Sequence, residues 1–121
     1  MTEKPTYFVN RCFGIVSADD LKLMVGRAAE IEEAHPEGID RITDFRDVEV
    51  FNLQYASVSD FAKSRRQQAF PRVIKSALVA DRPVAVGFAR MYQTILNHPQ
   101  IDLAIFPTME EALAWVTGGA A

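Results

Sequence analysis

The stretch Ile101-Asp102-Leu103-Ala104-Ile105-Phe106-Pro107-Thr108-Met109-Glu110-Glu111-Ala112-Leu113-Ala114-Trp115-Val116 contains both patterns from which the chain is built. In its first half, large apolar residues occupy every second position, which predicts a β-strand over 101–106. Pro107-Thr108 interrupts the strand, and two acidic residues then open an apolar segment, which predicts a helix over 108–117. A strand followed by a helix is therefore the unit to look for upstream.

Three further strand–helix units precede this one. Strands are predicted over 7–16, 39–45 and 73–80, where β-branched and aromatic residues concentrate. Helices are predicted over 18–34, 57–69 and 82–96, from apolar residues at helical spacing. Their expected starts are Ser17 for the first helix, Ser57 or Ser59 for the second, and Asp81 with Pro83 for the third.

The order of these elements predicts an α/β fold with a four-stranded, mainly parallel sheet, a (βα)4 superhelical turn. Right-handed crossovers place the helices mostly on one face if the strands pair in sequential order. The other face would then meet water, the chain ends or another subunit. Arg41 and Thr43 alternate with Ile42 on the second strand, which suits a sheet with one polar face.

Composition limits the class of protein. The 121 residues suit one domain, 1–121, with flexible ends at 1–5 and 118–121. A net charge of −3 gives no electrostatic reason to expect nucleic acid. Cys12 is the only cysteine and is expected to be buried in the first strand, which suits a reducing, cytoplasmic setting. No apolar run is long enough to cross a bilayer, and no ligand cluster or glycine motif points to a metal or an organic cofactor.

The sequence predicts a structural role for each of three isolated residues. His35 and His98 each precede a proline at a predicted helix end, so both are expected to cap helix C-termini rather than to bind a metal. Gly87 lies inside the third helix, where glycine is unfavourable, and is expected to permit close packing or the approach of a ligand.

Four segments give the chain a resemblance to the STAS-like superfamily, and within it to the bacterial SpoIIAA-like group. They span most of the sequence and read Gly14-Ile15-Val16-Ser17-Ala18-Asp19-Asp20-Leu21, Ile42-Thr43-Asp44-Phe45-Arg46-Asp47-Val48, Gly87-Phe88-Ala89-Arg90-Met91-Tyr92-Gln93 and Phe106-Pro107-Thr108-Met109-Glu110-Glu111-Ala112-Leu113-Ala114-Trp115-Val116. The resemblance implies a superhelical β/α fold. It also implies a regulator that binds partner proteins, or, as in a related branch, a protein that binds lipid-like ligands.

One segment departs from the pattern of this group. In its phosphorylated members an Asp-Ser-Ser-Gly-like run opens the second helix and supplies a switch serine, whereas this chain reads Phe51-Asn52-Leu53-Gln54 there. Ser57 and Ser59 lie a little downstream and are the remaining candidates for phosphorylation. The departure argues against partner switching by the familiar route and leaves the fold prediction unchanged.

The candidate binding surface extends from the end of the second strand into the second helix. Five large apolar residues fall within 48–55 without a clean period, so part of this run is expected to face solvent and to form an interaction patch. Phe51 and Tyr55 are the expected anchors, with Arg65 and Arg66 as a polar rim. The full set of candidate residues is Asp44, Arg46, Asp47, Val50, Phe51, Leu53, Tyr55, Ser57, Ser59, Arg65 and Arg66.

Two charged groups within or beside this surface have alternative readings. Asp44, Arg46 and Asp47 are expected at the carboxyl end of a strand, where they could bind a ligand or simply form a surface ion pair. The segment 63–75 contains basic residues and no acidic residue, whereas most of the charged residues in 19–49 are acidic. The basic segment could attract an anionic ligand or an acidic partner, including the acidic half of a second copy, or be an ordinary solvated face.

The sequence therefore predicts a non-enzymatic regulatory or protein-interaction domain of STAS-like type that self-associates as a homodimer. The alternative is a binding module for a small anionic or lipid-like ligand. No residue combination predicts a catalytic site, because no nucleophile is paired with a base at a recognisable spacing.

Overall fold

The computed structural model describes residues 7–118. The elements in chain order are β1 (Tyr7–Ser17), α1 (Ala18–Glu33), β2 (Asp40–Asn52), α2 (Tyr55–Arg66), β3 (Ile74–Val79), α3 (Pro83–Leu96), β4 (Ile101–Phe106) and α4 (Met109–Val116). Flexible ends were predicted at 1–5 and 118–121. Of these, 1–5 and 119–121 lie outside the described residues, and Gly118 forms a turn with a φ of 66°.

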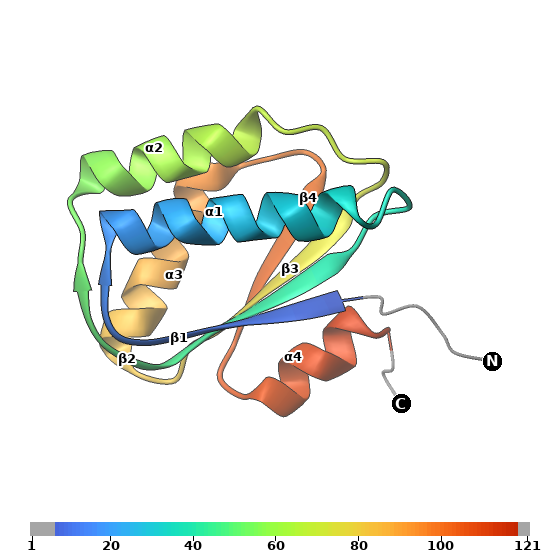
Figure 1. Cartoon of the computed structure of the whole chain (residues 1–121). Coiled ribbons are helices and arrows are strands. Elements are labelled where there is room, and N and C mark those ends of the chain that lie inside the picture. Colours follow the sequence, from blue (N-terminus) through green and yellow to red (C-terminus); the bar gives the residue numbers. More distant parts are fainter. Residues whose placement is uncertain (1–6, 119–121) are drawn as a thin grey trace.

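The four strands form one sheet in the order β1-β2-β3-β4, and every neighbouring pair is parallel. In Figure 1, α1 and α2 lie above the sheet and α4 lies below it. The α/β fold with a parallel sheet and sequential strand order confirms the prediction. It follows from the right-handed crossover rule, which sends each connecting helix to the same side.

Apolar residues pack on both faces of the sheet. The larger cluster lies between the sheet and α1, α2 and α3, and includes Phe45, Leu78 and Phe88. The smaller cluster lies under α4, where Ile42 and Val79 meet residues of that helix. Arg41 and Thr43 were expected on a polar face, but both are buried on the face that α1–α3 cover. Ile42, which alternates with them, belongs to the α4 face.

β2 is longer than predicted. It continues through residues 46–52, because β1 pairs with it as far as Ser17↔Asn52, across two register shifts. β3 leaves β2 after the pair Asp44↔Val79, so the second half of β2 has a neighbour on one side only. The run 48–55, which has no clean period in the sequence, is therefore β-strand as far as Asn52. The register shifts disturb the two-residue period from which a strand is recognised.

The apolar residues of this run divide between core and surface. Val48 is fully buried, and Phe51 and Leu53 pack against the main cluster. Phe51 stacks on Phe88 with ring centroids 4.3 Å apart. Val50 and Tyr55 are exposed. Phe51 is thus half-buried and packs against the core, which leaves less of its ring free for a partner than was expected.

The helix starts follow the prediction in two cases of four. Ser17 caps α1 through a capping box with Asp20, and Thr108 caps α4 by accepting from the Glu111 amide. α2 begins at Tyr55 after Gln54, without a side-chain cap, so neither Ser57 nor Ser59 starts it. α3 starts after Arg82, with Pro83 in its first turn as expected, and Asp81 is not its cap.

The structure confirms the prediction for His35 but not those of a C-terminal cap at His98 and close packing at Gly87. The His35 ring lies 2.8 Å from the Ile31 carbonyl oxygen at the end of α1, as expected for a C-terminal cap. The His98 ring instead lies 2.7 Å from the Gln68 carbonyl and accepts from the Gln100 amide, so it joins two loops. An added Cβ at Gly87 would meet nothing within 4 Å, so close packing there is wrong.

Candidate functional site

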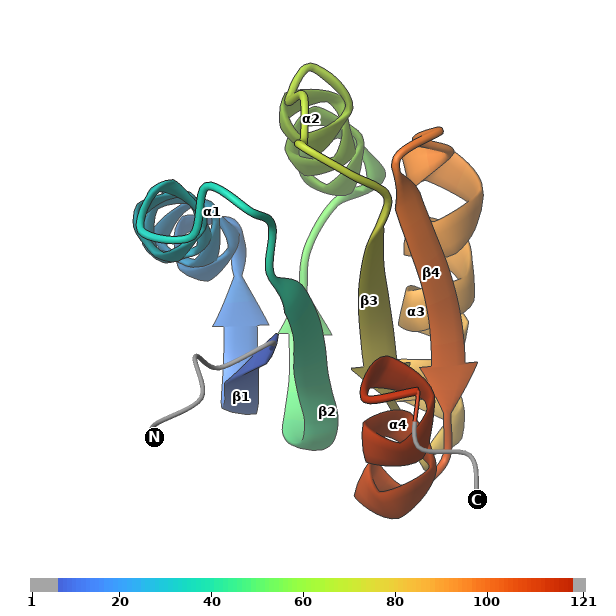
Figure 2. The same cartoon turned by 90° about the vertical axis from the view of Figure 1, so that its right-hand side faces the viewer.

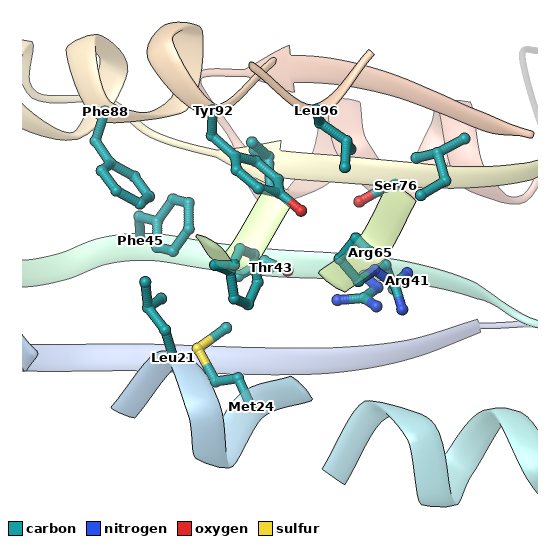
Figure 3. Close-up of a pocket in the computed structure, with 13 residues that line it drawn as sticks. Leu21, Met24, Arg41, Thr43, Phe45, Arg65, Ser76, Phe88, Tyr92 and Leu96 are labelled. Carbon is teal, nitrogen blue, oxygen red and sulfur yellow. The ribbon is translucent and has the colours of Figure 1, made fainter. Parts of the chain in front are cut away.

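A small cavity lies inside the main core, between the sheet and helices α1, α2 and α3 (Figure 3). Its volume is about 20 Å³, slightly above the roughly 10–15 Å³ that one water molecule requires. Most of its wall is apolar. Its polar groups are two arginines and three hydroxyls, from Arg41, Arg65, Thr43, Ser76 and Tyr92.

The two arginines meet at one end of the cavity, and Phe45 and Phe88 lie at the other (Figure 3). Arg41 comes from β2 and is 5% exposed, and Arg65 comes from α2 and is 2% exposed. Glu32 of α1 is the carboxylate they share. Arg65 donates to it at 3.0 Å, whereas the nearest nitrogen of Arg41 is 3.8 Å away. Two buried guanidinium groups therefore share one carboxylate.

Arg65 is well satisfied and Arg41 is not. Arg65 donates further to the Gln68 side chain at 2.6 Å and lies over the Phe70 ring. Arg41 lies over the Phe8 ring, but its Nε and one Nη have no hydrogen-bond acceptor among residues 7–118. The Nδ2 of Asn10 has none there either, and Asn10 pairs in register with Thr43 of the cavity wall. Buried donors without acceptors are rare in folded proteins.

Burial perturbs ionisation at this end of the core. Desolvation and the neighbouring Arg65 guanidinium lower the pKa of Arg41, because both disfavour a second positive charge. Desolvation also raises the pKa of Tyr92, which keeps its phenol protonated. The cavity thus contains neutral hydroxyl donors beside an excess of positive charge.

A groove between α1 and α2 lies directly outside this cavity. It has a volume of about 300 Å³ and is lined by residues of both helices, including Lys22, Ser57 and Ser64. Leu21 and Phe61 line both the groove and the cavity. These two side chains are therefore the partition between the buried arginines and the surface.

A second feature is an apolar patch on the sheet face opposite the cavity, formed by Val9, Phe13, Ile15 and Val50. Phe13 is 73% exposed and Ile15 63% exposed. Val9 pairs in register with Ile42, which α4 covers, so this patch continues the α4 face. α4 packs against β2, β3 and β4, and most of β1 lies beyond it (Figure 2). The patch is exposed because α4 packs against the other three strands and leaves most of β1 uncovered.

The acidic residues predicted near a strand end lie in mid-strand and form two separate ion pairs. Asp44 is buried and accepts from the Arg46 backbone amide and guanidinium, at 2.9–3.0 Å. These bonds hold the pKa of Asp44 below its ordinary value. Asp47 instead accepts from Arg11 of β1, with an Nε–Oδ2 distance of 3.1 Å. The expected position at the carboxyl end of a strand is wrong, since β2 runs on to Asn52.

The predicted surface is dispersed in the structure. Val50 belongs to the apolar patch and Ser57 to the α1–α2 groove. Phe51 and Leu53 are half-buried and pack against the core, and Arg65 is buried, so Arg65 is not part of an exposed polar rim. Of the other predicted residues, Tyr55 and Arg66 are exposed and Ser59 is half-buried, all on α2.

The basic segment is also partly neutralised within the chain. Arg65 pairs with Glu32, and Arg72 pairs with Asp40 at 2.9 Å. Lys75 donates to the Trp115 carbonyl and lies over its ring. Acids of the first half are thus partners of these bases inside one molecule.

Two groups of residues were missed from the sequence. Val9, Phe13 and Ile15 share one parity of the first predicted strand, and that alternation was the available signal. No local sequence pattern links Arg41, Arg65 and Glu32. The packing of β2, α2 and α1 in the tertiary structure brings them together.

The described residues contain neither a metal-binding cluster nor a helix that could span a membrane. In the range 7–118, no three His, Cys, Asp or Glu side chains gather in a group that could hold a metal ion. Over the same residues, no helix has the length and apolar character needed to span a membrane.

Comparisons with known proteins give one informative match. No family model matches the chain, and no curated protein matches it. Among solved structures, the chain is similar to an uncharacterised protein of the DUF3478 family from Shewanella loihica PV-4, described as having a SpoIIAA-like fold. The TM-score is 0.59 at 14% identity, over 89% of this chain and 82% of that one. Together with the parallel β1-β2-β3-β4 sheet, this match shows that the chain has a SpoIIAA-like fold.

Proposed function

We propose that this protein is a non-enzymatic, cytoplasmic regulatory domain of STAS-like type that acts by protein binding and self-associates through the patch Val9, Phe13, Ile15 and Val50. The single observation that supports this most directly is the exposure of Phe13 and Ile15 side by side on an open sheet face. A contiguous apolar patch on a soluble domain usually marks an interaction site.

A second copy of the chain is the partner that the patch fits best. Arg11 lies between Val9 and Phe13 in the alternating series of β1 residues that face the same side of the sheet. Asp47 of β2 forms an ion pair with Arg11. Both charges are largely exposed, so in a two-fold arrangement each Arg11 can exchange its partner for the Asp47 of the other copy. A surface that contains both members of an ion pair is self-complementary, which an isologous interface requires.

The free edge of β1 supports the same proposal. Among residues 7–118, β1 pairs only with β2, so its other edge presents backbone groups that a second strand can bind. Beside this edge, Phe13, Ile15 and Leu23 line a hollow of about 330 Å³ between β1 and α1. Backbone pairing and apolar burial are therefore available at the same place.

The test is oligomeric state, measured by size-exclusion chromatography with light scattering. We expect the wild type to be dimeric at high micromolar concentration and the double variant Phe13→Ser, Ile15→Ser to be a folded monomer. Both residues are exposed in the monomer, so its circular dichroism and melting temperature should change little. Val84→Ser is the matched control, because Val84 is half-exposed on α3, away from the patch.

Two results would contradict the proposal. One is a wild type that is monomeric throughout the concentration series. The other is a double variant that remains dimeric, since the interface would then lie elsewhere.

A further inference from the structure

We propose that the buried cavity is a binding site for a small monovalent anion, a halide ion or the carboxylate group of an organic acid, held by Arg41 and Arg65. The cavity and the apolar patch are on opposite faces of the sheet, so anion binding can be tested independently of self-association.

The first argument is charge. Arg41 and Arg65 contribute two positive charges to a region where Glu32 supplies one negative charge. Glu32 is 3.8 Å from Arg41 but hydrogen-bonded to Arg65, so it mainly neutralises Arg65. A buried ion without a partner is strongly unfavourable, and a bound anion would remove this imbalance.

The second argument is hydrogen bonding. Arg41 keeps two buried N–H groups without acceptors within the described residues, and its side chain lines the cavity. Thr43, Ser76 and Tyr92 add hydroxyl groups to the same wall. All of these can donate. The hydroxyl groups can also accept, but the N–H groups of Arg41 only donate, so an anion both accepts from them and balances the charge, whereas a water molecule would leave the charge uncompensated.

The third argument is size and access. A cavity of about 20 Å³ holds about one water-sized species, so a small halide ion fits most closely, and the head group of a carboxylate enters only when Leu21 and Phe61 rotate outward. The wall beyond the arginines is apolar, which strengthens the attraction of an ion to the guanidinium groups. Leu21 and Phe61 separate the cavity from the α1–α2 groove, so rotation of these side chains opens a path from solvent. An apolar tail on a carboxylate would extend into that groove.

The test is the melting temperature at constant ionic strength, with gluconate replaced stepwise by chloride, bromide, formate, acetate or hexanoate. Gluconate is the reference anion because the hydroxyl groups along its chain disfavour burial past the apolar side chains of Leu21 and Phe61. At about ten times the dissociation constant, a bound anion should raise the melting temperature by roughly 4–8 °C. A stronger effect of the halides identifies an inorganic ion, and a stronger effect of hexanoate identifies an organic acid whose tail occupies the groove.

Arg41→Met is the diagnostic variant. It should abolish the anion response and, because it removes an unpaired buried charge, be at least as stable as the wild type in gluconate. Arg66→Met, at an exposed arginine of α2, should keep the full response. If Arg41→Met does not fold, a bromide-soaked wild-type crystal provides a second measurement, with an anomalous peak expected in the cavity next to Arg41 Nε.

Three results would overturn the proposal. They are equal melting temperatures in gluconate and in all the small anions, an anion response that persists in Arg41→Met, and a bromide-soaked crystal without an anomalous peak in the cavity.

Discussion

Arg65 of α2 donates hydrogen bonds to the carboxylate of Glu32 of α1, with an Nη–Oε1 distance of 3.0 Å, and this pair joins the two helices over the cavity. Arg65 is 2% exposed and the Glu32 side chain 15%, so solvent screens their attraction only weakly. Glu32 is also the nearest carboxylate to Arg41.

Glu32→Gln is therefore expected to be strongly destabilising. It leaves two buried guanidinium groups without a carboxylate, and removal of one partner from a buried pair typically costs about 3–5 kcal/mol of unfolding free energy. Urea denaturation measures the loss. Glu33→Gln, at the exposed neighbouring position, is the control and should change stability by less than about 0.5 kcal/mol. Similar losses in both variants would mean that the pair does not stabilise the fold.

Substitution by serine is expected to lower the stability of the protein much more at Phe51 than at Tyr55. Phe51 packs edge-on against Phe45, with centroids 5.6 Å apart, and stacks on Phe88. Phe51→Ser should therefore cost about 3–5 kcal/mol, as for other core aromatic residues. Tyr55 is 66% exposed, so Tyr55→Ser should stay within about 0.5 kcal/mol. Thermal or urea unfolding of the two single variants distinguishes them, and comparable effects would show that Phe51 is not in the core.

Gly87→Ala is expected to stabilise the protein. Gly87 is exposed within α3, and a Cβ there meets no atom within 4 Å. Alanine should add about 0.5–1 kcal/mol through its higher helix propensity. Gly38→Ala is the opposing control. Gly38 has a φ of 97°, and a Cβ there would lie 2.9 Å from the Arg72 Nε. A destabilising Gly87→Ala would indicate a neighbour that the isolated chain lacks.

Cys12 is expected to be an unreactive thiol whose burial makes the stability of the fold depend on pH above about pH 9. Burial raises the pKa of Cys12 to about 11, from an ordinary value of 9.0. The folded state therefore favours the protonated thiol, and its contribution to stability should be complete below about pH 9 and be lost between about pH 9 and 11. At about pH 8 a thiol reagent should react roughly 100-fold more slowly with the native protein than with the unfolded chain.

Cys12→Ala is the control for the pH dependence. It should remove the part of the stability loss between about pH 9 and 11 that comes from this thiol. Rapid labelling of the native wild type would contradict burial of Cys12.

The element order and the parallel sheet were predictable because they depend on local patterns. Residues 101–116 alternate as a strand and then change to helical spacing, and the three upstream units repeat this change. Because the connections between parallel strands are short and right-handed, few strand orders are possible for four such units, and the sequential order is one of them. Ser17, Thr108 and Pro83 mark helix starts because capping is also a local interaction.

The site depended on contacts that no local pattern reports. The extension of β2 to Asn52 results from pairing with β1 across two register shifts, and it turned Phe51 inward. Arg65 and Glu32 are 33 positions apart and meet only because α1 and α2 pack side by side on the same face (Figure 1). Arg41 became buried because that same face is covered, although its sequence neighbours suggested an exposed one.

The sequence by itself therefore determined which segments are strands and helices and in what order they follow, since short-range propensity and periodicity decide both. Only the tertiary structure decided which side chains of each strand are covered. The position of α4 leaves Phe13 and Ile15 exposed, and the packing of α1–α3 encloses Arg41 and Arg65. Coverage of a sheet face is set by where a whole helix lies, and that position results from contacts summed over the entire fold.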